Sequence, residues 1–407
     1  MNTYRREPQA YTEDGIFMES KAATMLKLKD DEFPIGIVPT AGTVELSNKI
    51  NDYLMKWYYE ANPGIEDEPD AKRSLLISAK CPRFASGDGK GTLSETVRGD
   101  DLFIVTDVGN YSCEYNMFGR SVPMSPDDHF QDLKRIISAV GGKASRINVI
   151  MPILYGGRQH KRSSRESLDC AIALQELEAM GVENIITFDA HDPRVQNAVP
   201  LMGFDNVMPY YQVLKALLRK VKDLRIDKDH LMVVSPDEGA INRNMYYASV
   251  MGVDLGMFYK RRDFSVIVNG RNPIVAHEYL GASVKGKDIL VADDIIASGD
   301  SMLRLAEDLK NEGANRIFMF ATYGLFTEGL DKFQKAVDSG LITGVLSTNL
   351  TYRMPELLEK DWYIQVEMAK YIAYFVLALH RNQSITTLLD PHKKIADLLE
   401  RYKKGNI

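Results

Sequence analysis

The sequence predicts an α/β fold made of two units of similar size. From Gly36 onward, short apolar runs with β-branched residues alternate with stretches of helical periodicity. That alternation is typical of parallel sheets buried between helices. Because 407 residues exceed one ordinary domain, two such sheets are expected. The candidate strands are residues 102–106, 147–150, 184–188, 231–234, 289–292 and 316–320.

Two amphipathic helices are predicted between these runs, over residues 167–180 and 301–311. Each carries apolar side chains at helical spacing and runs into a glycine, Gly181 or Gly313, which suits a helix C-terminus. The buried faces are expected to comprise Leu168, Ile172, Leu174 and Leu177 in the first helix, and Leu303, Leu305, Ala306 and Leu309 in the second.

Composition disfavours several classes of protein. The formal net charge is −6 without a basic tail, which argues against nucleic-acid binding through bulk positive charge. No apolar run is long enough for a membrane span, and the first residues lack the apolar stretch of a signal peptide. Three cysteines without metal-ligand spacing favour a reducing, cytoplasmic location.

Positive charge is concentrated in two segments, residues 158–165 (RQHKRSSR) and 260–262 (KRR). Basic clusters on an acidic chain are commonly just solvated surface. The first cluster, however, follows a predicted strand, and the second precedes a polar stretch that reads as a mobile loop. Their positions make both segments candidates for binding a polyanion.

Residues 289–302 (ILVADDIIASGDSM) carry the strongest functional signal. An apolar strand runs into two aspartates, then into a loop of small and hydroxyl residues, then into a helix. Ligands of open α/β sheets bind at the carboxyl ends of strands, and a helix N-terminus offers free N–H groups to a phosphate. Asp293 and Asp294 would repel a phosphate, so they suit sugar hydroxyls or a metal-bound substrate. The alternative is an ordinary strand–turn–helix with an aspartate cap.

Further polar residues follow other predicted strands. They are Arg158 and Gln159 after residues 147–150, Asp189 and His191 after 184–188, and Asp237 after 231–234. In order and spacing these motifs, with residues 83–90 (RFASGDGK) upstream, resemble ribose-phosphate diphosphokinase, also called phosphoribosyl-diphosphate synthase. The resemblance runs from about Gly36 to about Leu389.

The resemblance implies an enzyme that transfers the diphosphoryl group of ATP to ribose 5-phosphate, with Mg²⁺ as cofactor. It implies two phosphoribosyltransferase-like domains, each a mostly parallel sheet flanked by helices, in a homo-oligomer (dimer or hexamer). The expected division is an N-terminal extension over residues 1–33, an ATP-side domain over 34–206, a ribose-5-phosphate-side domain over 207–361, and a helical tail over 362–407 that packs back on the N-terminal domain.

Carried over to this sequence, the family's motifs imply roles for four groups of residues. The implied catalytic residues are Lys260 and Arg262. The implied ATP-binding residues are Phe84, Ser86, Gly87, Asp88, Arg158 and Gln159. The implied ribose-5-phosphate-binding residues are Asp293, Asp294, Ala297, Ser298, Gly299, Asp300 and Ser301. The implied metal ligands are His191 and Asp237, with Asp189 as a possible third ligand. Because magnesium prefers oxygen ligands, His191 could instead donate a hydrogen bond to a phosphate.

The sequence departs from the family pattern at two of these segments. Asp300 puts a carboxylate where the family has a small residue beside the 5-phosphate. It is expected either to point outward and cap the helix near Ser301, or to weaken sugar-phosphate binding. In the adenine segment, Ser86 and Asp88 replace the usual Asp/Asn and Glu, so the nucleotide preference is open.

Two other functions were weighed against the synthase. A phosphoribosyltransferase that consumes the product would need only the loop at residues 297–301, not the Arg158–Gln159, Asp189/His191 and Lys260–Arg262 motifs. A catalytically silent regulatory subunit would be favoured by loss of Lys260 or His191, and both residues are present.

We predict that Lys260→Ala lowers turnover roughly 10²–10³-fold because a cation that stabilises the transition state is lost. The fold should remain intact, since no apolar pattern gives this residue a packing role. Steady-state kinetics combined with a thermal melt checks both points. Near-normal turnover in a stable variant would remove Lys260 from the catalytic assignment.

Overall fold

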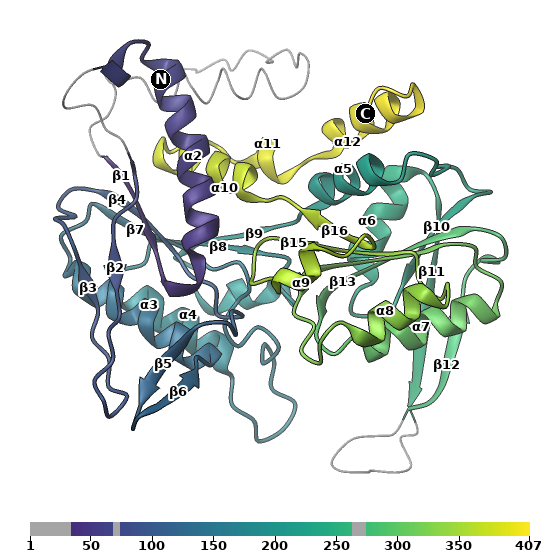
Figure 1. The fold of residues 1–407 in the computed structure, drawn as a ribbon, viewed down its shortest axis with the longest axis horizontal. Helices are drawn as coiled ribbons and strands as arrows, with labels where there is room; N and C mark the ends of the chain where they lie inside the picture. The colour runs from purple at the N-terminus through teal and green to yellow at the C-terminus, as the bar shows by residue number, and fades with distance from the viewer. Residues whose placement is uncertain (1–33, 68–73, 263–273) are drawn as a thin grey trace.

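The computed structural model describes residues 34–67, 74–262 and 274–407, and only the backbone at Glu66, 260–262 and 274–277. Two parallel sheets stand side by side in this part of the chain (Figure 1). The predicted extension 1–33, most of the charged loop near residue 70 and the polar loop after Arg262 lie outside the described residues. None of the described helices has the length and apolarity needed to cross a membrane.

The first sheet is entirely parallel, in the order β1-β4-β7-β8-β9. Its strands are β1 (Ile35–Pro39), β4 (Asp101–Val105), β7 (Arg146–Ile150), β8 (Asn184–Phe188) and β9 (Gly203–Val207). The helices beside it are α2 (Val44–Ala61), α3 (Pro126–Val140) and α4 (Asp169–Ala179). Smaller elements are η2 (Ala41–Thr43), η3 (Ile65–Asp67), η4 (Pro193–Ala198), β2 (Ala79–Lys80), β3 (Thr92–Leu93), β5 (Glu114–Met117) and β6 (Arg120–Pro123).

The second sheet has the order β12-β11-β10-β13-β14-β15-β16, and only the edge strand β12 is antiparallel to its neighbour. Its strands are β10 (Leu231–Ser235), β11 (Asp254–Arg262), β12 (Ile274–Leu280), β13 (Asp288–Ile296), β14 (Ile317–Gly324), β15 (Gly344–Thr348) and β16 (Tyr363–Val366). The helices are α5 (Tyr210–Lys220), α6 (Ile241–Met251), α7 (Asp300–Asn311), α8 (Asp331–Asp338) and α9 (Pro355–Leu358), followed by α10 (Ala369–His380), α11 (Thr386–Leu389) and α12 (His392–Lys403).

Alternation along the buried strands gives each sheet two apolar faces. In β4, Leu102 and Ile104 pack with α3 and α4, whereas Phe103 and Val105 face the cluster that contains α2 and α10. The second sheet follows the same rule, with α7 and α8 on one face and α5 and α6 on the other. The predicted α/β architecture with two mostly parallel sheets is therefore confirmed.

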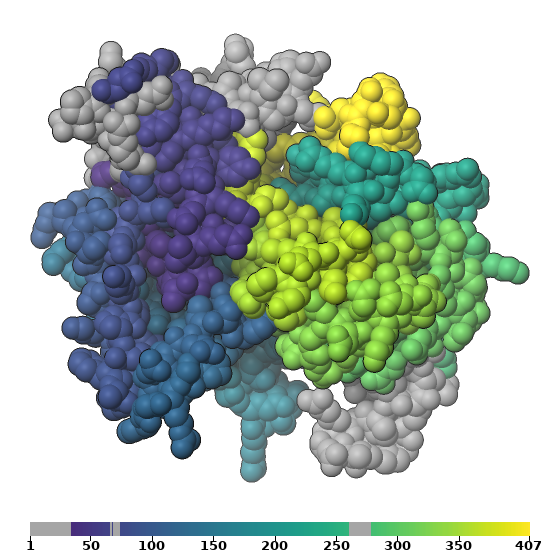
Figure 2. All heavy atoms as spheres, viewed as in Figure 1, coloured from purple at the N-terminus to yellow at the C-terminus, as the bar shows by residue number. Residues whose placement is uncertain are grey.

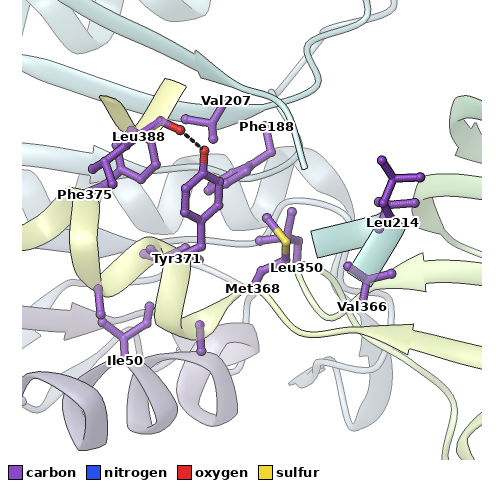
Figure 3. Close-up of a cluster of buried hydrophobic side chains, with 14 of the residues drawn as sticks. Ile50, Phe188, Val207, Leu214, Leu350, Val366, Met368, Tyr371, Phe375 and Leu388 are labelled. Carbon is purple, nitrogen blue, oxygen red and sulfur yellow. Dashed lines mark hydrogen bonds between the residues drawn. The ribbon is translucent and has the colours of Figure 1, made fainter. Parts of the chain in front are cut away.

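One apolar cluster is shared by both domains. Figure 3 shows Phe188 and Val207 of the first sheet and Leu214 and Val366 of the second domain, together with Phe375 from α10. Buried residues of both domains belong to this one cluster, so neither domain completes its core alone. Figure 2 shows yellow-green residues of the second domain against the purple residues of the first, where ion pairs join Arg353 to Glu45 at 3.0 Å and Lys49 to Glu367 at 3.4 Å.

All six predicted strands are present, but three details of the sequence prediction were wrong. β13 continues through Asp293 and Asp294 to Ile296, so the two aspartates lie within the strand and not after it. Ile172 is 54% exposed, because the buried stripe of α4 runs along Cys170, Ala173, Leu174 and Leu177 at helical spacing. In α7, Met302 is buried, whereas Leu303, which was expected to be buried, is only partly buried.

The C-terminal region also differs from the expected division. β16 belongs to the second sheet, which therefore extends past residue 361. α10 packs against α2 of the first domain, whereas α12 packs against α5 and α6 of the second. The tail thus bridges both domains.

We predict that Phe375→Ala lowers the free energy of unfolding by about 3–5 kcal/mol, because it leaves a cavity in the shared core. Tryptophan fluorescence during denaturant unfolding measures this free energy. It reports on both domains, because Trp57 lies in α2 of the first domain and Trp362 lies beside β16 of the second. Both signals should shift together, since the core is common. Ile172→Ala is the exposed control; an equal loss in the two variants, or separate transitions in wild type, would contradict a shared core.

Candidate active site

The candidate site lies where the carboxyl ends of both sheets face each other. A cavity of about 530 Å³ is lined by residues of both domains, including Arg158, Gln159, Asp189, His191 and Asp294. A second cavity of about 180 Å³ is lined by Asp237, Asp293 and the loop at residues 296–302. Ile295 borders both cavities, so a ligand in one is next to a ligand in the other.

Asp189 and Arg243 form a buried ion pair across the domain boundary. Arg243 Nη2 donates to Asp189 Oδ1 at 2.7 Å and its Nε to Oδ2 at 2.9 Å, while Thr322 Oγ1 donates to Oδ2 at 2.5 Å. Asp189 is 2% exposed and has a positive φ of 44°. Both carboxylate oxygens accept hydrogen bonds within the protein, and the possible role of Asp189 as a third metal ligand stays a prediction.

Asp293 and Asp294 point to different cavities because successive residues of a strand face opposite sides of the sheet. Asp294 Oδ2 is 2.7 Å from His191 Nδ1 in the larger cavity, and Asp293 lines the smaller one. Arg243 Nη1 is 3.5 Å from Asp293. One arginine of the second domain thus serves carboxylates of both domains.

These contacts shift the pKa values of Asp293 and Asp294 in opposite directions. Burial and the neighbouring Asp294 carboxylate raise the pKa of Asp293. Burial would also raise the pKa of Asp294, but the hydrogen bond from His191 and the charge of Arg243 outweigh it and lower that pKa. The bond to Asp294 raises the pKa of His191. With Nδ1 bound to Asp294, His191 has Nε2 left for a ligand.

The loop before α7 has the form of a phosphate cradle. Gly299 adopts a φ of 88°, and a Cβ there would meet the Phe333 ring at 2.2 Å, so only glycine allows this close packing. α7 begins at Asp300, and its first residues line the smaller cavity, so a helix N-terminus borders that cavity. Ala297, Ser298 and Ser301 line the same cavity.

Asp300 lines the smaller cavity and is not the helix cap, so the expected capping role is wrong, and its effect on sugar-phosphate binding stays a prediction. Gly299 occupies the cap position. The Asp300 carboxylate accepts from Ser298 Oγ at 3.0 Å and from Lys332 Nζ at 2.6 Å. The surface ion pair with Lys332 replaces the predicted capping bond.

The remaining predicted residues lie in other places. Phe84, Ser86, Gly87 and Asp88 form a tight turn, with Ser86 Oγ donating to Asp88 at 2.7 Å, and none of the four lines the two cavities. Phe84 is 58% exposed. The backbone of Lys260 and Arg262 lies in β11, and their side chains fall outside the described residues.

Three residues at or beside the cleft carry no signal in the sequence that predicted a role for them. Arg243 lies six residues after Asp237, and its position in the sequence gives no sign of the ion pair with Asp189. The Tyr323 hydroxyl joins the domains, because the carbonyl oxygens of Pro152 and Phe188 both lie within hydrogen-bond distance of its single O–H donor. The His160 ring lies 5.3 Å from the His191 ring. A hint was available only for His160, which directly follows Gln159.

Comparison with known proteins agrees with this arrangement. The fold and cleft define a two-domain α/β protein of the phosphoribosyltransferase type. A family model of the N-terminal domain of ribose phosphate pyrophosphokinase matches residues 35–181, and a phosphoribosyl transferase domain model matches residues 204–330. The chain belongs to the ribose-phosphate pyrophosphokinase family.

Individual relatives carry the same name. The ribose-phosphate pyrophosphokinase of Shewanella oneidensis is 27% identical over 319 residues, covering 77% of this chain and 91% of that protein. That of Thermotoga maritima is 27% identical over 310 residues, covering 75% and 88%. The crystal structure of phosphoribosylpyrophosphate synthetase from Mycobacterium smegmatis shares the fold, with a TM-score of 0.65, 20% identity, and coverage of 86% of this chain and 99% of that one.

We predict that Asp189→Ala lowers the free energy of unfolding by about 3–5 kcal/mol, because it leaves the Arg243 charge buried without its partner. Calorimetric or denaturant unfolding measures the loss, and Asp223→Ala, which breaks a surface pair with Arg316, is the control with little effect. A stable Asp189→Ala protein whose activity requires much more magnesium would instead support Asp189 as a metal ligand.

Proposed function

We propose that the chain transfers the diphosphoryl group of ATP to the C1 hydroxyl of ribose 5-phosphate, giving 5-phosphoribosyl 1-diphosphate and AMP. One observation carries the proposal: a cavity bordered by Arg158, Gln159 and His191 adjoins a phosphate cradle at the N-terminus of α7. Two polyanions that react with each other need such neighbouring sites, one on each domain.

The ribose 5-phosphate side is supported by the smaller cavity. The 5-phosphate would accept hydrogen bonds from the backbone N–H groups of residues 299–301 and from the hydroxyl of Ser301. Asp293, which lines the same cavity, would accept from the ribose hydroxyls. Both interactions hold the C1 hydroxyl toward the larger cavity.

The ATP side is supported by individual residues that line the larger cavity. Arg158 supplies positive charge, and Tyr111 and Tyr155 add aromatic surface. The C1 hydroxyl loses its proton to water and its oxygen forms a bond to the β-phosphorus, while the bond between that phosphorus and the bridging oxygen of the α-phosphate breaks, so AMP leaves with that oxygen. Diphosphoryl transfer depends mainly on in-line positioning and on positive charge near the phosphate oxygens, and Lys260 and Arg262 are proposed to provide further charge.

Magnesium is proposed as the cofactor, with Asp237 and Nε2 of His191 as the residues that would hold it together with substrate phosphates. Magnesium is usually held by one or two protein carboxylates plus phosphates rather than by a protein cage. Among the described residues no group of three or more metal-ligating side chains stands ready, so such a shared site is the one that fits. When bound, the ion would neutralise phosphate charge.

The proposal includes a homo-oligomer, dimer or hexamer, in the cytoplasm. The exposed Phe84 turn is the structural support for subunit contact, since it carries the adenine motif yet does not line the cavities. The phosphoribosyltransferase alternative accounts for the second domain only, whereas the family match over residues 35–181 requires the first as well.

The direct test measures AMP and 5-phosphoribosyl 1-diphosphate with ATP and ribose 5-phosphate, each omitted in turn, with and without magnesium. We expect equal amounts of both products only when all three components are present. AMP formed without ribose 5-phosphate, or no AMP in the complete mixture, would reject the function.

Asp237→Ala should raise the magnesium concentration needed for half-maximal activity, with partial recovery at high magnesium, because a hard cation loses an oxygen ligand. Asp237 Oδ1 also accepts from the Ala240 N–H at 3.2 Å, so a melting curve must accompany the kinetics. Glu238→Ala, which removes the exposed neighbouring acid, is the matched control. A magnesium curve identical to wild type would remove Asp237 from the metal site.

A further inference from the structure

We propose that Lys332 is a positioning residue for sugar-phosphate binding, because it holds the Asp300 carboxylate away from the phosphate cradle. The inference rests on the proposed function. It explains how the ribose 5-phosphate site can contain the acidic residue Asp300. Lys332 lies outside every motif recognised in the sequence, 32 residues after Asp300.

The need for such a residue follows from charge. Asp300 is the first residue of α7 and lines the smaller cavity. Its carboxylate is therefore close to the proposed binding site of the phosphate dianion. Two negative groups in contact repel, and they compete for the same N–H groups at the helix N-terminus. A side chain free to rotate toward the cavity would therefore weaken binding.

The observed contacts oppose that rotation. Lys332 Nζ is 2.6 Å from Asp300 Oδ1, and Ser298 Oγ donates to Oδ2 at 3.0 Å, so each carboxylate oxygen has a partner. These bonds, led by the one from Lys332, lower the pKa of Asp300. The carboxylate is thus held charged and turned toward α8.

The backbone that carries Lys332 is itself fixed against the cradle. The next residue, Phe333, is fully buried and its ring packs directly against Gly299. Lys332 Nζ also lies 2.6 Å from Glu328 Oε2, four residues earlier in the turn before α8. The packing of the Phe333 ring on Gly299 therefore sets the distance between α8 and the loop. The ammonium group of Lys332 then restrains the Asp300 carboxylate.

A double-mutant cycle tests this role. Lys332→Met should raise the KM for ribose 5-phosphate about fivefold or more, because the carboxylate is no longer restrained, while kcat and the KM for ATP stay near wild type. Asp300→Asn should leave that KM level or lower. The double variant should return to the Asp300→Asn value, because without the carboxylate there is nothing to restrain.

Glu328→Gln is the matched control, since it removes the other ion pair of Lys332 and should leave the KM for ribose 5-phosphate unchanged. A Lys332→Met variant with an unchanged KM overturns the proposal. So does a double variant that keeps the raised KM, since Lys332 would then contact the phosphate itself. Melting curves of all four variants show whether the loop is still folded.

Calorimetric titration with ribose 5-phosphate separates this inference from the proposed function. If wild type forms no AMP, the proposed function is rejected. The double-mutant cycle can still be measured, with dissociation constants for ribose 5-phosphate in place of KM values. The expected pattern is weaker binding in Lys332→Met and recovery in the double variant. No binding of ribose 5-phosphate to wild type rejects both.

Discussion

The Arg243 guanidinium, buried between carboxylates of both domains, is the interaction on which the cleft depends. Its bonds to Asp189 fix the end of the first sheet, and its approach to Asp293 fixes the second. A buried charge without a partner is strongly unfavourable, so separating the two domains costs more here than at an ordinary surface. The shared apolar core behind the pair adds to that constraint. As a result, both sheets present their carboxyl ends to one space.

Three acidic residues in a site for two polyanions have a close hydrogen-bond or ion-pair partner. Asp189 is paired with Arg243, Asp294 with His191 and Asp300 with Lys332. Burial and its neighbour raise the pKa of Asp293, which therefore binds a proton more readily than an ordinary carboxylate does. These interactions reduce the repulsion between the acids and the phosphates of the substrates.

The sequence predicted the strands and the phosphate loop because both depend on local patterns. Short β-branched runs marked β4, β7, β8, β10, β13 and β14, and small residues before a helical pattern marked the cradle. β13 was cut short because charged residues normally end an apolar run, whereas Asp293 and Asp294 stay in the ladder opposite β14. The pairs Asp189–Arg243 and Asp300–Lys332 join residues 54 and 32 positions apart, which no local pattern reveals.

The most direct test of the account follows the phosphorus that moves between the two cavities. ATP radiolabelled in its β-phosphate is incubated with ribose 5-phosphate, magnesium and the enzyme, and the products are separated. The account predicts that the label appears in 5-phosphoribosyl 1-diphosphate in step with unlabelled AMP. Label recovered in ADP, or released as free phosphate or diphosphate without labelled sugar product, would contradict it.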